Sequence, residues 1–142
     1  MKKIISVNNN STAADIGLLI ARFGVAVLML THGLPKLVML FSGAAVTFPP
    51  VMGMSPELSL GLAVFAEVLC SLFLLAGFLT RLATIPLIVT MLIAALLIHA
   101  PDAFAVKEAS IQYLLVYVVL LISGSGRYSV DNLLQQRVSS VK

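Results

Sequence analysis

The sequence predicts an all-α integral membrane protein: a bundle of four transmembrane helices in a single domain, residues 1–142. The first observation is the composition, because 60% of the residues are hydrophobic and 11% are charged, whereas an ordinary soluble domain is about a quarter charged. The mean hydropathy is +1.08. The second is the length of the apolar segments, because about 20 helical residues cross the hydrocarbon core of a bilayer. Four candidate segments occupy residues 16–41, 57–79, 82–100 and 109–123.

The first segment fits a transmembrane helix better than a cleavable signal peptide. Lys2 and Lys3 would suit the basic start of a signal peptide, but the polar run SVNNNSTAAD separates them from the apolar stretch. That stretch is also longer than the apolar region of a signal peptide. We expect the helix to begin near residues 12–15, where Asp15 suits the positive end of the helix dipole.

The connections between the segments are unequal. The second and third segments are separated only by GFLTR, in which Gly77 ends one helix and Arg81 lies at the headgroups. The first and second are joined by the uncharged run FSGAAVTFPPVMGMSP. Its simpler interpretation is an interfacial linker, and the alternative is that residues 48–55 cover the bundle as a lid. Met52 and Met54 suggest copper ligands, but methionine commonly fills gaps in packing.

The distribution of basic residues predicts that both termini are cytoplasmic. An even number of spans places both termini on one side of the membrane. That side would hold Lys2, Lys3, Arg81, Arg127, Arg137 and Lys142. The opposite side would hold only Lys36 and Lys107, so the positive-inside rule assigns the termini to the cytoplasm. This bias and the attraction of anionic headgroups account for the net charge of +3, and the scattered basic residues do not indicate nucleic-acid binding.

Polar side chains inside the spans are the candidates for a functional site. Ionisable side chains there cost on the order of 3 kcal/mol each on insertion scales, so they normally face the bundle interior and find partners. At about 100° per residue, the three ionisable residues of the first span fall within a sector of about 80°. The candidate pocket-lining residues are Arg22, His32, Lys36, Glu67, His99, Glu108 and Gln112.

These residues predict one polar pocket in the outer half of the bundle. With the orientation above, most of them come to a similar depth, and Glu67 lies beneath them. The stretch THGLPK would line the pocket, since Pro35 frees a backbone carbonyl near Thr31 and Gly33 permits a bend or a close neighbour. The pocket would open towards the outer face.

Five of the seven candidates also have a purely structural interpretation. Arg22 and Glu67 suit a buried ion pair that sets helix register. His32 and Lys36 are placed to extend their polar ends to the outer headgroups. His99 suits the negative end of the third helix. The clustering of all of them at one level favours a pocket.

Ordered motifs along the chain resemble the DoxX family of small bacterial membrane proteins. They are an arginine and HGLPK in the first span, AEVLCSLFLLAGFLTRLAT around the second, MLIAALLIHAP ending the third and GSGRYSVD after the fourth. The likeness covers residues 16–134. The residues that carry it are Arg22, Gly33, Lys36, Glu67, Gly77, Thr80, Arg81, His99, Gly124, Gly126, Tyr128, Ser129 and Asp131.

The resemblance implies a four-helix fold in the bacterial inner membrane and a loose association with redox chemistry. The family is named after a subunit of a thiosulfate:quinone oxidoreductase, and relatives are linked to thiol and oxidative-stress partners. The sequence itself contains no C-x-x-C, C-x-x-C-H or G-x-G-x-x-G motif that would hold a prosthetic group.

Two classes of function fit these observations. In the first, the pocket binds a quinone or a similar small lipophilic molecule, and the protein is a subunit or accessory of an oxidoreductase. His32, His99 and Glu67 would then donate or accept protons. In the second, the bundle is a non-enzymatic binding or transport module that holds an anion or polar solute through Arg22 and Lys36.

A metal site is a third interpretation. His32, His99 and Glu67 or Glu108 are adequate ligands for zinc or iron, but the i, i+3 or i, i+4 ligand pair typical of helical sites is absent. We therefore assign no metal.

The expected partners are the lipid bilayer, an oxidoreductase subunit or a second copy of the chain. The small residues Ala13, Gly17 and Ala21 recur at four-residue steps. This spacing permits close helix packing, either within the bundle or in a homodimer.

Overall fold

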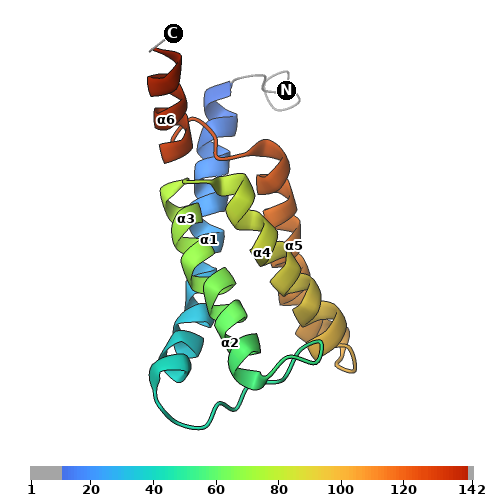
Figure 1. Cartoon of the computed structure of the whole chain (residues 1–142). Helices are drawn as coiled ribbons and strands as arrows, with labels where there is room; N and C mark the ends of the chain where they lie inside the picture. Colours follow the sequence, from blue (N-terminus) through green and yellow to red (C-terminus); the bar gives the residue numbers. More distant parts are fainter. Residues whose placement is uncertain (1–10, 141–142) are drawn as a thin grey trace.

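The computed structural model describes residues 11–140, and these are helical apart from the connections (Figure 1). Four helical runs are long and apolar enough to cross a membrane, which confirms the predicted all-α fold of four membrane-spanning helices. The runs are Ser11–Phe41, Pro56–Ala76, Thr80–Ile98 and Phe104–Ser123. Lys2, Lys3 and Lys142, on which the predicted orientation partly rests, lie outside the described residues.

Two of the four runs change helix type along their length. The first run is the single helix α1 (Ser11–Phe41), and the fourth is α5 (Phe104–Ser123). The second run comprises α2 (Pro56–Val64), the π-helix η1 (Phe65–Cys70) and α3 (Ser71–Ala76). The third comprises α4 (Thr80–Ile93) and the π-helix η2 (Ala94–Ile98). Hydropathy carries no signal for such π-turns, which are frequent at functional sites.

The fourth run is longer than its apolar segment, because it begins at Phe104 and not at residue 109. The charged residues that open it lie in its first turns, where Lys107 Nζ donates to the carbonyl of Ala100 at 2.7 Å. A sixth α-helix, α6 (Val130–Ser139), follows the fourth run and was not predicted. Ser129 caps α6 by accepting from the backbone N–H of Asn132 at 3.2 Å.

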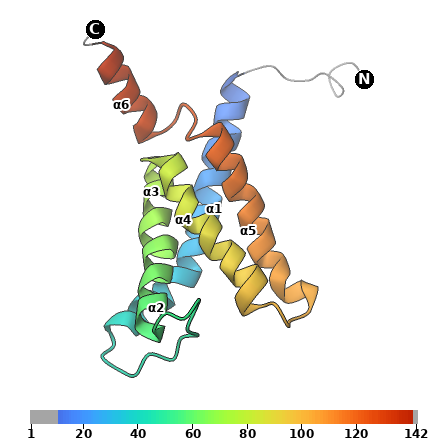
Figure 2. The same ribbon diagram turned by 45° about the vertical axis from the view of Figure 1, so that its right-hand side comes forward.

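The four runs alternate in direction and pack as two antiparallel pairs. The run α1 contacts α2, η1 and α3, while α4 contacts α5, and η1 joins the pairs through its contact with α4. Figure 2 shows the pairs diverging towards one end of the bundle. We call that end, which carries residues 42–55 and 99–103, the loop end, and we call the opposite end the α6 end.

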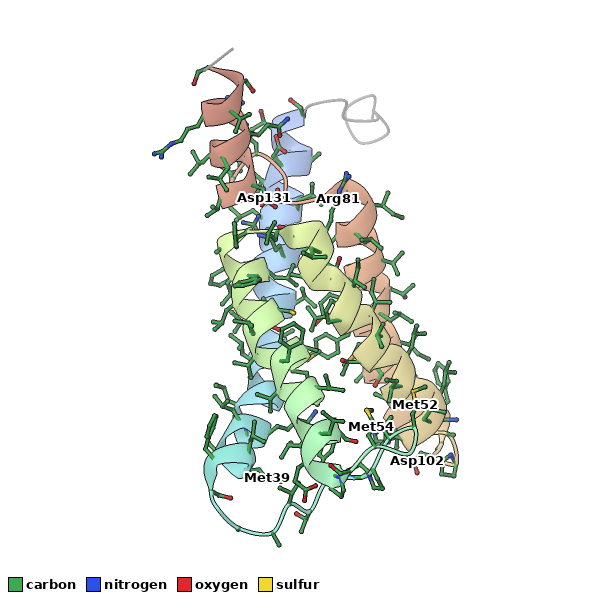
Figure 3. All side chains as sticks on the ribbon, viewed as in Figure 1. Met39, Met52, Met54, Arg81, Asp102 and Asp131 are labelled. Atoms are coloured by element: carbon green, nitrogen blue, oxygen red, sulfur yellow. The ribbon has the colours of Figure 1, made fainter. Side chains whose placement is uncertain are left out.

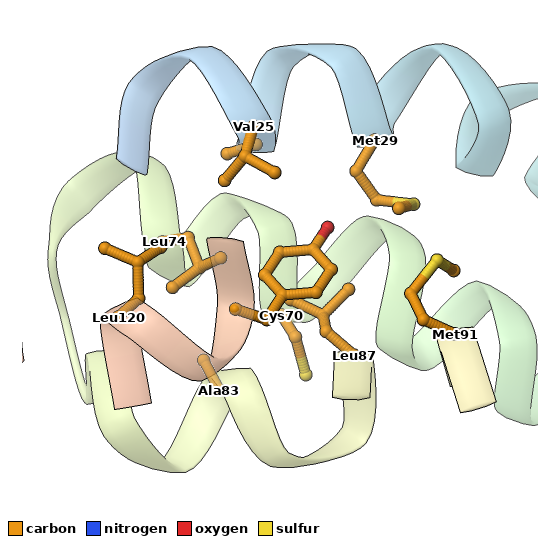
Figure 4. Close-up of a cluster of buried hydrophobic side chains, with 10 residues drawn as sticks. Val25, Met29, Cys70, Leu74, Ala83, Leu87, Met91 and Leu120 are labelled. Atoms are coloured by element: carbon orange, nitrogen blue, oxygen red, sulfur yellow. The ribbon is translucent and has the colours of Figure 1, made fainter. Parts of the chain in front are cut away.

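The close-packed core lies in the half of the bundle nearer to α6, and every run contributes to it (Figure 4). Tyr117, Leu74 and Leu87 are among its fully buried side chains. Its members are Val25, Ala26, Met29, Cys70, Leu74, Ala83, Leu87, Met91, Tyr117 and Leu120. Because this half is filled, space between the helices is left in the loop half.

The outer faces of the helices are apolar, as contact with lipid requires. Exposed side chains such as Phe23, Leu115 and Ile122 cover them. A Cβ atom added at Gly17 would have no described neighbour within 4 Å. The small residues around Gly17 are therefore not used for close packing among the described residues, and a homodimer through them stays a prediction.

Candidate ligand-binding site

A cavity of about 430 Å³ occupies the loop half of the bundle, between α2–η1 and α4–η2. Most of its walls are aliphatic or aromatic, and its polar lining includes Lys36, Glu67 and His99. The remaining lining residues are Phe48, Pro49, Val51, Met54, Ser59, Leu62, Ala63, Phe65, Ala66, Pro86, Val89, Thr90, Ile93, Ala94 and Ile98. A mostly apolar pocket of this size with a few converging polar groups is typical of small-molecule sites.

An ion pair between α1 and η1 forms the polar wall of the cavity. Lys36 Nζ lies 2.5 Å and 2.7 Å from the two carboxylate oxygens of Glu67. The Glu67 side chain is 3% exposed, whereas that of Lys36 is 28% exposed. An ammonium has three N–H donors, so one remains for a ligand after two are directed at Glu67. The Phe48 ring centroid lies 5.8 Å from Lys36 Nζ, within the range of a cation–π contact.

Gly33 brings these two charges together. A Cβ atom added at Gly33 would lie 2.8 Å from Val68 Cγ2 and 3.0 Å from the carbonyl carbon of Glu67. Only glycine therefore lets α1 approach η1 this closely, one turn before Lys36. The π-turn contains Glu67, and Ala66 and Glu67 within it are buried.

Residues 42–55, which we call the roof loop, fold over the cavity at the loop end. The simpler expectation of an interfacial linker is therefore wrong, because Phe48, Val51 and Met54 line the cavity. The backbone N–H of Val51 donates to Ser59 Oγ at 3.1 Å, which ties the loop to α2. Met52 is exposed while Met54 faces the cavity, so the two methionines, labelled in Figure 3, do not share a site.

His99 stands at the loop end of the cavity. It ends η2, where its backbone N–H donates to the carbonyl of Ala94 at 2.9 Å. Its Nδ1 atom lies 2.7 Å from Asp102 Oδ2, a contact that fixes the orientation of the ring. His99 therefore lies both at the end of the third helical run, as predicted, and in the wall of the cavity.

The other predicted pocket residues lie elsewhere. His32 is exposed, and its ring meets the edge of Tyr113 with centroids 5.9 Å apart. Glu108 Oε1 accepts from Gln112 Nε2 at 3.1 Å, on an exposed part of α5. Of the seven candidates, the structure brings only Lys36, Glu67 and His99 to the cavity.

Arg22 belongs to a separate polar cluster at the α6 end. Its side chain is buried, and its two terminal nitrogens donate to the carbonyls of Ser125 and Tyr128, each at 2.8 Å. The expected ion pair between Arg22 and Glu67 is therefore wrong. Arg22 lies in the half of α1 nearer to α6, whereas Glu67 is already neutralised by Lys36.

Gly77 and Asp131 complete this cluster, which we call the terminal clasp (Arg22, Gly77, Asp131 and the carbonyls of Ser125 and Tyr128). The Asp131 carboxylate accepts from the backbone N–H groups of Leu79 and Thr80 at 2.7 Å and 3.1 Å, and so caps the start of α4. The Asp131 N–H donates to the Gly77 carbonyl at 2.9 Å. Figure 3 labels Asp131 beside Arg81 at this end.

The terminal clasp was missed by the sequence reasoning, although a signal for part of it was present. Asp15, expected to interact with its own helix dipole, instead accepts from the backbone N–H of Arg127 at 3.0 Å. The sequence Y-S-V-D is typical of a helix start, with Ser129 as the N-cap residue. A groove of about 590 Å³ lies beside the clasp, lined by Thr80, Arg81 and Asp131 among others. The Asp131 oxygens in the groove accept from the backbone N–H groups of Leu79 and Thr80.

The fold defines a multi-pass α-helical membrane protein, and a cavity lies in one half of its bundle. The family model of DoxX matches residues 17–100, and the chain belongs to the DoxX family. It is also similar to the inner membrane protein YqjF of Escherichia coli (strain K12), with 32% identity over 129 residues that cover 87% of this chain and 95% of that protein. No solved structure matches the chain.

These comparisons confirm the family that the motifs indicated. Together with the four apolar runs, they support a multi-pass protein of the inner membrane. In the structure, the motif residues of the family resemblance separate into two groups. Lys36, Glu67 and His99 line the cavity and Gly33 packs against Glu67, while Arg22, Gly77 and Asp131 lie in the terminal clasp.

Proposed function

We propose that this protein binds a quinone-like or other small lipophilic molecule in the cavity, as a redox-associated membrane subunit or accessory. The observation that carries the proposal is the Lys36–Glu67 ion pair in the wall of an otherwise mostly apolar cavity. A polar ligand head would meet the ion pair, and its apolar part would meet the aliphatic walls.

The polar groups of the cavity suit a carbonyl-bearing head. Lys36 retains an N–H donor, and His99 and Glu67 are of the side-chain types that donate and accept protons in catalysis. Reduction of a quinone consumes protons, and its electrons would come from a partner oxidoreductase. The proposed role of this chain is to hold the head and to supply proton-exchanging groups.

The two other functions considered receive less support from the geometry. An anion held by Arg22 and Lys36 would need both cations in one pocket, but Arg22 binds the carbonyls of the terminal clasp and Lys36 binds Glu67. A metal site would need His32 beside His99, whereas His32 packs on Tyr113. Among residues 11–140, no group of three or more His, Cys, Asp or Glu side chains is placed to hold a metal ion.

Analysis of what co-purifies with the protein tests the proposal. The wild type, a Lys36→Met/Glu67→Leu double variant and a Glu108→Gln control would be purified in mild detergent. Replacing both charges with apolar groups of similar volume should preserve the fold, and size-exclusion chromatography checks this. Extracted lipids would be identified by mass spectrometry, with absorption spectra and metal content measured on the same samples.

We expect a quinone or related lipid at stoichiometric amounts in the wild type and in Glu108→Gln, and its loss in the double variant. If the double variant still retains the lipid, the Lys36–Glu67 ion pair is not part of the binding site. Stoichiometric metal would favour the metal interpretation. A wild-type protein free of both metal and specific lipid would leave the non-enzymatic module as the better description.

A further inference from the structure

We infer that the cavity is loaded sideways from the bilayer, between α2–η1 and α4, and that its ligand is a membrane-dissolved amphiphile with an uncharged head. This inference deepens the proposed function, since it rests on a ligand occupying the same cavity. It adds the route of entry and the class of molecule that can use that route.

The side wall of the cavity is the first observation. Leu62, Phe65 and Val89 line the cavity, yet they are also 48%, 47% and 48% exposed, among the exposed large hydrophobic side chains of the bundle. Phe65 and Val89 lie nine residues from the ends of their runs, which is roughly 14 Å at about 1.5 Å per residue. That depth is near the middle of a hydrocarbon core about 30 Å thick. These side chains therefore separate the cavity from lipid and not from water.

The divergence of the helices explains why an opening lies there. The run α4 contacts η1 near the middle of the bundle, and Figures 1 and 2 show α2 and the loop-end part of α4 moving apart beyond that point. Apolar side chains bridge the resulting space. Rotation of such side chains is fast, so they can open and close without a change in the backbone.

The second observation is that the roof loop covers the end of the cavity that would face water. The roof loop carries no charged residue, and four of its residues, Phe48, Pro49, Val51 and Met54, line the cavity. Val51 is buried and tied to Ser59, while Phe48 lies over the Lys36 ammonium. A water-soluble ligand would have to displace this loop, whereas a lipid-dissolved one would not.

The two opposite charges of the polar wall favour a ligand whose head is uncharged. Lys36 and Glu67 neutralise each other, so a charged head would be buried without a counter-ion, at a large desolvation cost. An uncharged head with carbonyl or hydroxyl groups can bond the free Lys36 N–H. A cavity of about 430 Å³ has room for a head and a short part of a tail. The rest of a longer tail would stay in the bilayer, beyond Leu62 and Val89.

Single-tryptophan reporters can test the route, because the sequence contains no tryptophan. Ile93→Trp places the reporter in the cavity wall. Tyr117→Trp is a sealed-core control, Leu115→Trp a lipid-facing control and Met52→Trp a water-facing control, as the exposures of these residues indicate. Each variant would be reconstituted in vesicles of ordinary or dibrominated phosphatidylcholine, and quenching would be measured with the brominated lipid and with iodide.

We expect brominated lipid to remove a fraction of Ile93→Trp fluorescence close to that of Leu115→Trp and well above that of Tyr117→Trp. Iodide should quench Ile93→Trp far less than Met52→Trp. Quenching of the cavity reporter by iodide but not by lipid would place the entrance at the roof loop, and quenching by neither would show a sealed cavity; both results would overturn the inference.

A second cavity reporter, Ile98→Trp, replaces the first if Ile93→Trp does not fold. Quenching by brominated lipid requires no bound ligand. The route can therefore be refuted while ligand binding stands, and the reverse is also true.

Discussion

Arg22 is a buried cation whose two terminal nitrogens bond to backbone carbonyls, while its Nε has no hydrogen-bond partner among the described residues. Its guanidinium donates to two carbonyls that lie more than a hundred positions further along the chain. Gly77 makes room for it: the residue has φ of +67°, and an added Cβ atom would overlap the Arg22 guanidinium and lie 2.7 Å from Ser129 Cβ. Glycine is thus required there both by conformation and by space.

Gly77→Ala should therefore destabilise the protein by about 3 kcal/mol, because it adds the loss of Arg22 bonds to the strain of a left-handed alanine. The matched control is Gly53→Ala, at φ of +78° with no described atom within 4 Å of the added Cβ. It should cost only about 1 kcal/mol. Equilibrium unfolding in detergent–SDS mixtures measures both values. Equal losses for the two variants would mean that the contact with Arg22 contributes nothing.

At the residue scale, three of the seven candidate residues, Lys36, Glu67 and His99, line the cavity, but the expected partner of Glu67 was wrong. Arg22 and Glu67 were the expected pair because both lie well inside their spans. The long aliphatic stem of Lys36 lets its charge reach more deeply into the bundle than its backbone does, so it meets Glu67 first. Hydropathy and helical periodicity place Cα atoms, and they do not say how far a flexible side chain extends.

The π-turn η1 is the element that shapes the site. A π-turn widens the helix locally, and here it does so where α1 lies closest, at Gly33. The second π-turn, η2, borders the opposite wall of the cavity through Ala94 and Ile98. Helix irregularities therefore bound the cavity on two sides.

Gly33→Ala should push α1 away from η1 and weaken the Lys36–Glu67 contact, with a destabilisation of about 1–3 kcal/mol from overpacking. It should also lower the amount of lipid that co-purifies. Gly24→Ala is the matched control on the same helix, since no described atom lies within 4 Å of its added Cβ; it should be neutral or slightly stabilising. Unfolding and lipid extraction measured on both variants decide the matter, and normal lipid content in Gly33→Ala would contradict the role given to this contact.

Elements were predictable where hydrophobicity alone determines them. The four spans follow from long apolar segments, and the structure has four such runs. The start of α5 at Phe104 was missed because Lys107 and Glu108 interrupt the apolar pattern, although charged residues are tolerated in a helical turn near the headgroups. The fold of the roof loop could not be predicted, because its uncharged side chains suit a membrane surface and a cavity equally well.

The whole molecule divides into a filled half and a hollow half. The α6 half holds the close-packed core and the terminal clasp, while the loop half holds the cavity and the ion pair. Rigid packing in one half provides a base from which the helices diverge in the other. This division lets one small bundle combine a close-packed half with a cavity.

The orientation in the membrane stays a prediction, in which the α6 end is cytoplasmic. Among the described basic residues, Arg81, Arg127 and Arg137 lie at that end, which suits the positive-inside rule. Met52→Cys and Gln136→Cys place exposed thiols at opposite ends, while the native Cys70 is buried. A membrane-impermeant maleimide applied to cells with a permeabilised outer membrane but an intact inner membrane should label only Met52→Cys. Labelling of Gln136→Cys alone would reverse the assigned orientation.

The terminal clasp also bears on biogenesis. Arg22 is made long before its partners, because the Ser125 and Tyr128 carbonyls that accept its hydrogen bonds, and the Asp131 carboxylate that caps α4, lie more than a hundred residues further along the chain. A nascent chain therefore carries this guanidinium without its carbonyl partners until the residues that follow α5 have been made. We therefore expect any fragment that ends before the clasp to be less stable than the whole chain, because its buried guanidinium lacks these partners.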